Sequence, residues 1–192
     1  MHRHFKIYKP YGVLSQFISN AKDQRRKRFL GELYDFPKGS MAIGRLDEKS
    51  EGLLLITTDG KLSTQITSAK VEKEYYALVD GIISDKAIAA LSCGVEIGFE
   101  GKKYITKPCK VQRLQQPPRL PERSKKIRDA RHGPVSWISM ILKEGKFRQV
   151  RKMTSAVGHP TLRLVRIRVG YVTLDAMNAS DVIEIDANDV LI

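Results

Sequence analysis

The stretch AIGRLDEKSEGLLLITTDG, residues 42–60, contains the side chains best suited to chemistry. Asp47 follows Arg45 by two residues and directly precedes a strongly apolar run. A short apolar run bounded by glycines is typical of a buried strand, so the carboxylate would be held at the edge of a rigid sheet. From the residues alone, Asp47 is either a turn cap or the reactive group of an active site, with Arg45 as its cationic neighbour.

The composition limits the classes of protein to consider. The chain has 192 residues, is 42% hydrophobic and carries a formal net charge of +13. That length can bury one sizeable core, and the positive charge favours an anionic partner, with nucleic acid ahead of a membrane surface. Solubility alone is the alternative explanation of the charge. The N-terminus lacks the apolar core of a signal peptide and no apolar run reaches about 18 residues, so we expect a cytoplasmic protein without a membrane partner.

Cofactor and metal motifs do not stand out in the sequence. Cys93 and Cys109 are the only cysteines, and their spacing matches neither a zinc site nor a disulfide framework. We expect buried or free thiols in a reducing compartment. The four histidines are dispersed, and neither a phosphate-binding glycine loop nor a dinucleotide fingerprint is present. We therefore expect no metal and no cofactor.

Short strand-like runs outnumber helical patterns, which predicts an α+β fold around a mostly antiparallel sheet flanked by helices. Strands are predicted at residues 5–10, 52–60, 72–81, 103–114, 135–142, 161–170 and 182–186. Helices are predicted after the basic stretch near residue 29, and at 61–69, 85–93 and 146–157. Ser84 is the expected N-cap of the third helix, and Pro108 should place its strand at an edge or a bulge.

Two segments are rich in cations, residues 19–29 and 115–134, and both are predicted to be loops. The second contains several prolines, and its basic residues outnumber its acids, so it is unsuited to a core. We expect Lys125, Lys126 and Arg128 in this loop to contact an RNA backbone.

The helix at 146–157 has a cationic and an apolar side. Arg148, Arg151 and Lys152 fall on one face, while Val150 and Met153 lie on the other. No acid occurs between Glu144 and Asp175 in sequence, so an external anion could neutralise these charges. The alternative is an ordinary solvated basic face. We expect Arg148 and Lys152 to contact phosphates.

Two strands add further candidates. In the strand at 161–170, Leu164 shares a face with Arg166, and we expect the strand to bury leucines first and then to present arginines. Lys73 and Tyr75 are two residues apart and should point to one face. A tyrosine beside cations suits the stacking of unpaired RNA bases, although a tyrosine at such a position is more often part of the core.

Three separated motifs resemble the pseudouridine synthases related to the small-subunit ribosomal RNA enzyme. The motifs are GRLDEKSEGLLLITTDG, EKEYY and EGKFRQVRKMTSAVGHPTLRLVRIRVG, in the family's order. The segment LPERSKK and the sequence after it look closest to a branch that acts on the large ribosomal subunit. The resemblance extends from about residue 5 to residue 186. It implies the pseudouridine synthase fold in a single catalytic domain, residues 1–192, without the S4-like N-terminal domain of many relatives.

The resemblance also implies the reaction, which isomerises a specific uridine of 23S ribosomal RNA to pseudouridine without a cofactor. Asp47 would be the catalytic carboxylate, acting as a nucleophile at C1′ or as a base at C2′. Either role requires an ionised carboxylate, which a cation within ~4–6 Å favours. Arg151 would be that cation. Where several relatives have Asn-His, this chain has Phe147-Arg148, so family roles are not transferred to those two positions.

Further roles follow from the same resemblance. A base in folded RNA must first leave its stack, which costs on the order of a few kcal/mol. Arg45 would hold the vacated space, Tyr75 would stack on the flipped uracil, and Lys73 would support the pocket or a phosphate. Leu164 would form an apolar wall beneath the base, or is simply part of the core.

Two other function classes stay open at this point. A non-catalytic RNA-binding or ribosome-assembly protein would explain the cationic segments equally well, and a synthase could act on another RNA such as tRNA. A metal-dependent nuclease would need clustered acids, which the sequence lacks. We expect a monomer.

Overall fold

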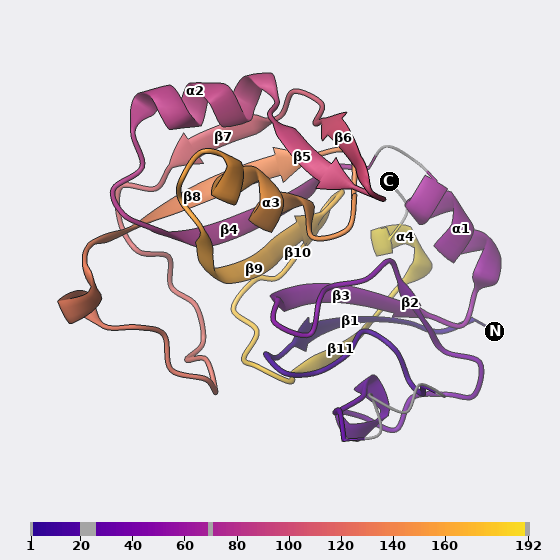
Figure 1. Cartoon of the computed structure of the whole chain (residues 1–192). Coiled ribbons are helices and arrows are strands. Elements are labelled where there is room, and N and C mark those ends of the chain that lie inside the picture. The colour runs from indigo at the N-terminus through magenta and orange to yellow at the C-terminus, as the bar shows by residue number, and fades with distance from the viewer. Residues whose placement is uncertain (1, 20–25, 69–70, 191–192) are drawn as a thin grey trace. The chain divides into compact units, whose positions relative to one another are not determined.

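The computed structural model describes residues 2–19, 26–68 and 71–190 (Figure 1). The chain forms two compact units. Unit 1 comprises Met1–Val71, Pro121–Lys125 and Val165–Ile192. Unit 2 comprises Glu72–Leu120 and Lys126–Leu164.

Unit 1 is built on a sheet with the strand order β11–β1–β3–β9, in which β2 lies beside β3 and β10 beside β9. The strands are β1 (His4–Lys9), β2 (Met41–Ile43), β3 (Glu51–Thr57), β9 (Thr161–Val169, in unit 1 from Val165), β10 (Val172–Thr173) and β11 (Val182–Ile185). β3 and β9 pair in parallel, while β1–β3, β1–β11, β2–β3 and β9–β10 pair antiparallel.

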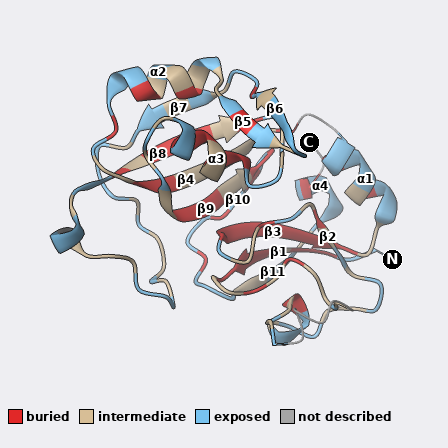
Figure 2. Ribbon diagram, viewed as in Figure 1, coloured by how far each residue is buried: buried red, intermediate tan, exposed pale blue. Residues whose placement is uncertain are grey.

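Every residue of β3 is buried, as the red ribbon in Figure 2 shows. This confirms the interpretation of the apolar run after Asp47 as a buried strand. The helices of unit 1 are the 3₁₀ turn η2 (Leu30–Glu32), α1 (Gly60–Ser68) and α4 (Ala187–Val190). The core of the unit is formed by side chains from β1, β3 and the segments between them: Phe5, Ile7, Val13, Leu30, Leu54 and Ile56.

Gly52 lies where β3 begins to pair with β9. Its φ is +100°, and an added Cβ would stand 2.3 Å from the backbone oxygen of Arg166. Only glycine combines this backbone conformation with so close an approach between strands. The glycine that follows Glu51 is therefore required by the parallel pairing.

Unit 2 contains the antiparallel strands β4, β8 and β7, in that spatial order, and a separate β5–β6 hairpin. The strands are β4 (Lys73–Asp80), β5 (Glu96–Phe99), β6 (Lys102–Ile105), β7 (Lys110–Arg113) and β8 (Val135–Leu142). The helices are α2 (Asp85–Cys93), the 3₁₀ turn η3 (Ala130–His132) and α3 (Gln149–Ala156). Helix α2 contacts β7, and α3 contacts β5 (Figure 1).

The predicted α+β fold is confirmed, and so is the cap of α2. Ser84 Oγ accepts a hydrogen bond from the N–H of Ala87 at 3.2 Å, and Gly94 ends the helix with φ +103°. Such a cap stabilises a helix because it satisfies a donor that has no partner within the helix. Buried side chains from β4, α2, β8 and α3 form the core of unit 2.

Two predicted boundaries are wrong. The strand expected at 103–114 is divided into β6 and β7, which belong to different sheets. Pro108 lies in the break and has no N–H to donate to a ladder, while the N–H of Cys109 donates to Ser92 O at 3.0 Å instead. The helix expected from residue 146 begins at Gln149, because Arg148 adopts a left-handed conformation with φ 53°.

The two thiols are free. Cys93 is exposed, whereas Cys109 is half-buried and donates to Leu91 O at 3.3 Å. Burial raises the pKa of the Cys109 thiol to about 11. Cys109 is therefore a packing residue and not a reactive one.

Candidate active site

Asp47 lies in unit 1, in the connection between β2 and β3. Its side chain is half-buried, and Arg45 is exposed. A turn closes directly after Asp47, because the N–H of Ser50 donates to Asp47 O at 3.0 Å and Ser50 Oγ lies 3.4 Å from Asp47 Oδ2. The carboxylate is thus held immediately before a fully buried strand.

Ser15 holds the same connection from a distant part of the chain. Its Oγ donates to Leu46 O at 2.8 Å and accepts from Leu46 N–H at 2.9 Å. Leu46 is itself buried between Arg45 and Asp47. These two hydrogen bonds and the apolar anchor restrict the backbone on which the carboxylate stands. Nothing in the local sequence around Ser15 indicated this contact.

Lys9 is buried next to this connection and was not among the predicted site residues. Its Nζ donates to the carbonyls of Pro10 at 3.0 Å, Val13 at 2.7 Å and Glu48 at 3.5 Å. Burial lowers the pKa of Lys9 to about 7, although the acids Glu51 and Asp47 act in the opposite direction. The one signal in the sequence was a lysine sharing strand parity with Phe5 and Ile7.

The predicted loop at 115–134 contributes to unit 1 through Pro121–Lys125. The guanidinium carbon of Arg123 lies 4.3 Å from the centroid of the Tyr11 ring, and Lys125 Nζ lies 6.0 Å from it. The neighbouring Gly12 N–H donates to Glu48 O at 2.8 Å. A cationic segment from far along the sequence therefore lies beside the loop that contacts the residue after Asp47.

Unit 2 holds Lys73, Tyr75, Arg151 and Leu164. Lys73 and Tyr75 lie on β4, are half-buried and share strand parity. Tyr75 is opposite Met140 of β8 and packs against the core of the unit. Leu164 is buried in that same core.

Helix α3 and the residue before it carry three of the predicted cations of unit 2. Val150 and Met153 are buried, which confirms the amphipathic pattern. Arg151 is half-buried, and its Nη1 donates to Thr161 O at 3.4 Å. Lys152 is also half-buried and donates to Gly98 O at 2.7 Å, so its ammonium is held against the β5–β6 hairpin. Arg148 precedes the helix and is exposed.

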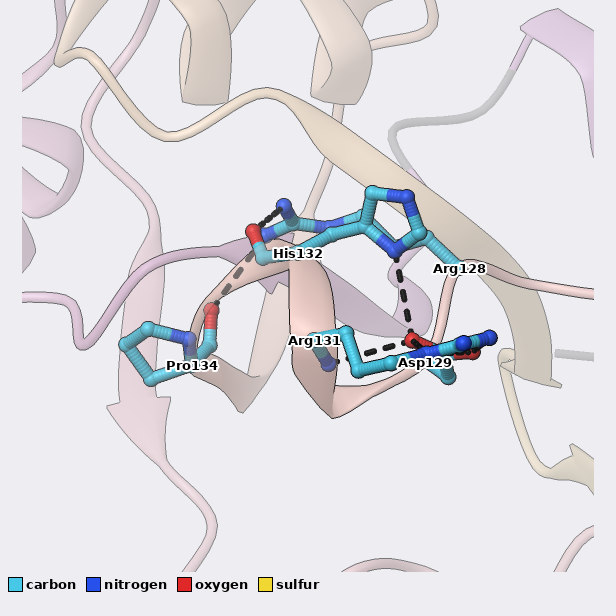
Figure 3. Close-up of polar contacts among 5 residues, drawn as sticks. All are labelled: Arg128, Asp129, Arg131, His132 and Pro134. Carbon is cyan, nitrogen blue, oxygen red and sulfur yellow. Dashed lines mark hydrogen bonds and ion pairs between the residues drawn. The ribbon is translucent and has the colours of Figure 1, made fainter.

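The cations of the loop before β8 divide into two kinds. Lys125 and Lys126 are exposed. Arg128 instead forms an ion pair with Asp80. It also donates to the carbonyls of His132 and Pro134, the latter at 3.3 Å (Figure 3). Its side chain is only 22% exposed, so Arg128 fastens the end of the loop to unit 2.

The other predicted basic segment, 19–29, lies partly outside the described residues. Within the described part, Lys27 Nζ is 2.9 Å from both carboxylate oxygens of Glu48, and Arg28 pairs with Glu32 at 3.1 Å. The first of these ion pairs again involves the residue after Asp47.

The expectation that β9 presents its arginines is wrong for Arg166. Arg166 is only 3% exposed, and its Nε donates to Leu53 O at 2.8 Å. Arg168 is half-buried, and its Nη1 donates to Gly170 O at 2.8 Å. Strand parity predicted the face of the strand on which Arg166 lies. It could not predict how deeply the side chain is buried, because burial depends on the neighbouring strands. Arg166 therefore serves the β3–β9 packing.

The structure thus brings Arg45, Asp47 and Lys125 into unit 1, and the other predicted site residues into unit 2. Among residues 2–19, 26–68 and 71–190, no group of three or more His, Cys, Asp or Glu side chains could hold a metal ion. Within these same ranges, none of the helices has the length and apolarity needed to cross a membrane.

Known proteins match this chain over most of its length. The family model described as RNA pseudouridylate synthase matches residues 3–156. Ribosomal large subunit pseudouridine synthase E of Xanthomonas axonopodis pv. citri is 42% identical over 173 residues, covering 89% of this chain and 87% of the relative. The protein of the same name from Vibrio parahaemolyticus is 39% identical over 86% of this chain and 66% of the relative. The predicted resemblance to the large-subunit branch is confirmed.

Solved structures agree in fold. A crystal structure of a pseudouridylate synthase has a TM-score of 0.77 at 24% identity, covering 99% of this chain and 73% of the other. Human RNA pseudouridylate synthase domain containing 1 has a TM-score of 0.56, covering 95% of this chain and 78% of the other. With the matched family model, these similarities confirm the predicted pseudouridine synthase fold, and the chain belongs to the RNA pseudouridylate synthase family.

Proposed function

We propose that this protein isomerises a specific uridine of large-subunit (23S) ribosomal RNA to pseudouridine. Family membership and the similarity to relatives named for the large subunit support this proposal. Because that RNA is made and modified in the bacterial cytoplasm, the protein acts there. It works as a monomer with a single catalytic domain, residues 1–192, and it requires neither metal nor cofactor.

Asp47 is the proposed catalytic carboxylate. In the reaction the C1′–N1 bond breaks, the uracil turns, and a C1′–C5 bond forms; C5 loses its hydrogen and N1 gains a proton. One carboxylate can serve this exchange, as nucleophile at C1′ or as base at C2′. The observation that supports the assignment is the position of Asp47 in a connection held by Ser15 and Lys9, since a fixed reactive group lowers the entropic part of a barrier.

The proposed binding residues supply stacking and charge. Tyr75 stacks on the extruded uracil, Arg45 holds the space that the base leaves, and Arg151 contributes a positive charge to substrate binding. Lys73 supports the pocket or a phosphate, and Leu164 supports the base from the core. The proposed contacts to the RNA backbone are Arg148, Lys152, Lys125, Lys126 and Arg128.

The direct test is Asp47→Asn, assayed by tritium release from ribosomal RNA labelled at C5 of uridine. Release should fall to background while the affinity for the RNA stays within about twofold, because the amide keeps the shape and loses the charge. Asp35→Asn, an exposed aspartate of the same unit, is the matched control and should retain activity. Wild-type release by Asp47→Asn would refute the assignment of Asp47.

The substrate is tested separately. Wild-type protein should release tritium from 23S ribosomal RNA and not from tRNA, and EDTA should leave the rate unchanged. Carbodiimide primer extension on RNA from a deletion strain would then locate the modified uridine. Activity on tRNA alone would overturn the proposed substrate and leave the reaction class intact.

A further inference from the structure

An exposed aromatic ring stands directly before α3. Phe147 is 68% exposed, whereas Val150 and Met153, within the first turns of the same helix, are buried. A single exposed apolar side chain is common on protein surfaces and needs no explanation. The surroundings of this one point to a ligand.

The backbone that carries Phe147 is fixed by Gln149, whose own side chain is buried. Lys146 N–H donates to Gln149 Oε1 at 2.9 Å, and Gln149 N–H donates to Lys146 O at 3.0 Å. Gln149 Nε2 donates to Glu144 Oε1 at 2.5 Å. These bonds close a turn on both sides of Phe147. A ring presented on a fixed turn loses little conformational entropy when it binds.

A cation lies beside the ring. Lys152 Nζ lies 5.5 Å from the centroid of Phe147 and is held there by its hydrogen bond to Gly98 O. The ammonium of Lys146, the residue before Phe147, is instead directed to two other rings, 4.6 Å from the centroid of Phe99 and 5.0 Å from that of Tyr104. Ammonium groups within about 6 Å of a ring face interact favourably with its quadrupole. The sequence from Gly145 to Val157 contains no acid.

An exposed aromatic ring with the Lys152 ammonium beside it, followed in the chain by the exposed Arg148, matches the chemistry of an unpaired nucleotide. The ring can stack on a base of any identity, while neighbouring cations attract its phosphates. A base-paired helix offers no such face, because its bases are stacked inside. The same surface would gain less from an acidic peptide, which has charge but no planar group to stack.

We propose that Phe147 is a stacking platform for an unpaired base of the RNA substrate, apart from the uridine that is modified, with Arg148 and Lys152 contacting the adjacent phosphates. This inference rests on the proposed function. It adds a residue that distinguishes single-stranded from base-paired RNA at one position of the substrate. The turn closed by Gln149 presents the ring, and the hairpin that holds Lys152 sets the charge beside it.

The test compares Phe147→Leu, which keeps an apolar side chain but loses the ring, with Phe147→Tyr, which keeps the ring. Fluorescence anisotropy would measure binding of a single-stranded RNA of about 15 nucleotides and of the same strand in a duplex. Phe147→Leu should weaken single-strand binding about tenfold and duplex binding by less than about twofold. Phe147→Tyr should bind both probes like wild type.

Tyr171→Leu is the control, because it removes an 80% exposed aromatic ring from unit 1, and it should change neither affinity. Wild-type single-strand affinity for Phe147→Leu, or an equal loss on the duplex, overturns the platform. Tritium release from 23S RNA separates the two proposals. If Phe147→Leu loses single-strand affinity but wild type releases no tritium, the platform is supported and the proposed function is refuted. If wild type releases tritium but Phe147→Leu keeps its single-strand affinity, the proposed function is supported and the platform is refuted.

Discussion

At the scale of residues, the candidate site depends on two side chains whose importance lies in contacts with backbone. Lys9 joins the carbonyls of Pro10, Val13 and Glu48, and Ser15 fastens Leu46 through both its donor and its acceptor. Neither contact is to Asp47 itself. Both hold the segment on which Asp47 stands, and its geometry therefore follows from burial elsewhere in unit 1.

Lys9→Met should destabilise the protein by about 2–4 kcal/mol, because it leaves buried carbonyls without their donor. Urea unfolding would measure the loss. Lys49→Met, at an exposed lysine of the same connection, is the matched control and should change stability by less than about 0.5 kcal/mol. Equal effects of the two substitutions would contradict the structural role of Lys9.

The same substitution should alter the pH dependence of stability. Burial lowers the pKa of Lys9 to about 7 from 10.5, so between these values the unfolded chain binds a proton that the folded protein has released. The free energy of unfolding of wild type therefore rises with pH in this interval, by at most about 1.4 kcal/mol per pH unit. The gain is lost as the pH falls through about 7. Lys9→Met has no amine to titrate, so the difference in free energy of unfolding between wild type and this variant should increase between about pH 6.5 and 9.5. A difference that stays constant over this range would contradict the lowered pKa of Lys9.

At the scale of elements, the parallel pairing of β3 with β9 positions the strand that follows Asp47. Glu51 is opposite Val165, and Gly52 is opposite Arg166. The pairing brings backbone so close to Gly52 that no side chain fits, and the buried Arg166 then donates to Leu53 O. The end of the Asp47 connection is therefore defined by a contact between segments far apart in sequence.

Gly52→Ala should lower stability by about 3 kcal/mol or more, because it adds both a steric clash and an unfavourable φ. For a chain of this length that corresponds to a decrease in Tm of about 6 °C or more. Gly60→Ala is the control, since Gly60 begins α1 and an added Cβ there meets nothing within 4 Å. It should be neutral or stabilising by up to about 1 kcal/mol. A Tm for Gly52→Ala within a degree or so of that for Gly60→Ala would show that the strand can shift at little cost.

At the scale of the whole molecule, the net charge of +13 governs attraction to RNA. Some of the cations also have acidic partners within the fold. Lys27 pairs with Glu48, and Arg128 pairs with Asp80, so both also stabilise the fold. The exposed Lys125 and Lys126 are the better probes of the loop at 115–134.

The double substitution Lys125→Ala and Lys126→Ala should weaken RNA binding and make its salt dependence shallower. Each lost phosphate contact reduces the slope of log K against log salt by about 0.7–0.9. Filter binding over a range of KCl concentrations would measure it. Lys86→Ala with Lys110→Ala, two exposed lysines elsewhere, removes the same charge and should leave the slope nearly unchanged. Equal slopes for the two double variants would mean that only net charge matters, and that this loop does not contact the RNA.

Most of the elements and the family can be predicted from the sequence. Local periodicity and capping residues predict the buried strand β3, the capped helix α2 and the amphipathic helix α3. These signals depend only on residues close in the chain. The same local order carries the motifs around Asp47, Tyr75 and Arg151. Pro108 indicated an interruption of the strand predicted at 103–114. It did not indicate that the two halves of this segment belong to different sheets.

Tertiary contacts determine which polar and charged side chains are buried and which backbone groups they bind. Lys9, Ser15 and Arg166 read as ordinary polar positions, yet each is buried and bonded to backbone that is brought near by strand pairing or loop packing. The same holds for Pro121–Lys125, which joins unit 1 from the middle of a loop. The physical reason is that desolvation and hydrogen-bond partners depend on neighbours across the fold, which no local pattern contains.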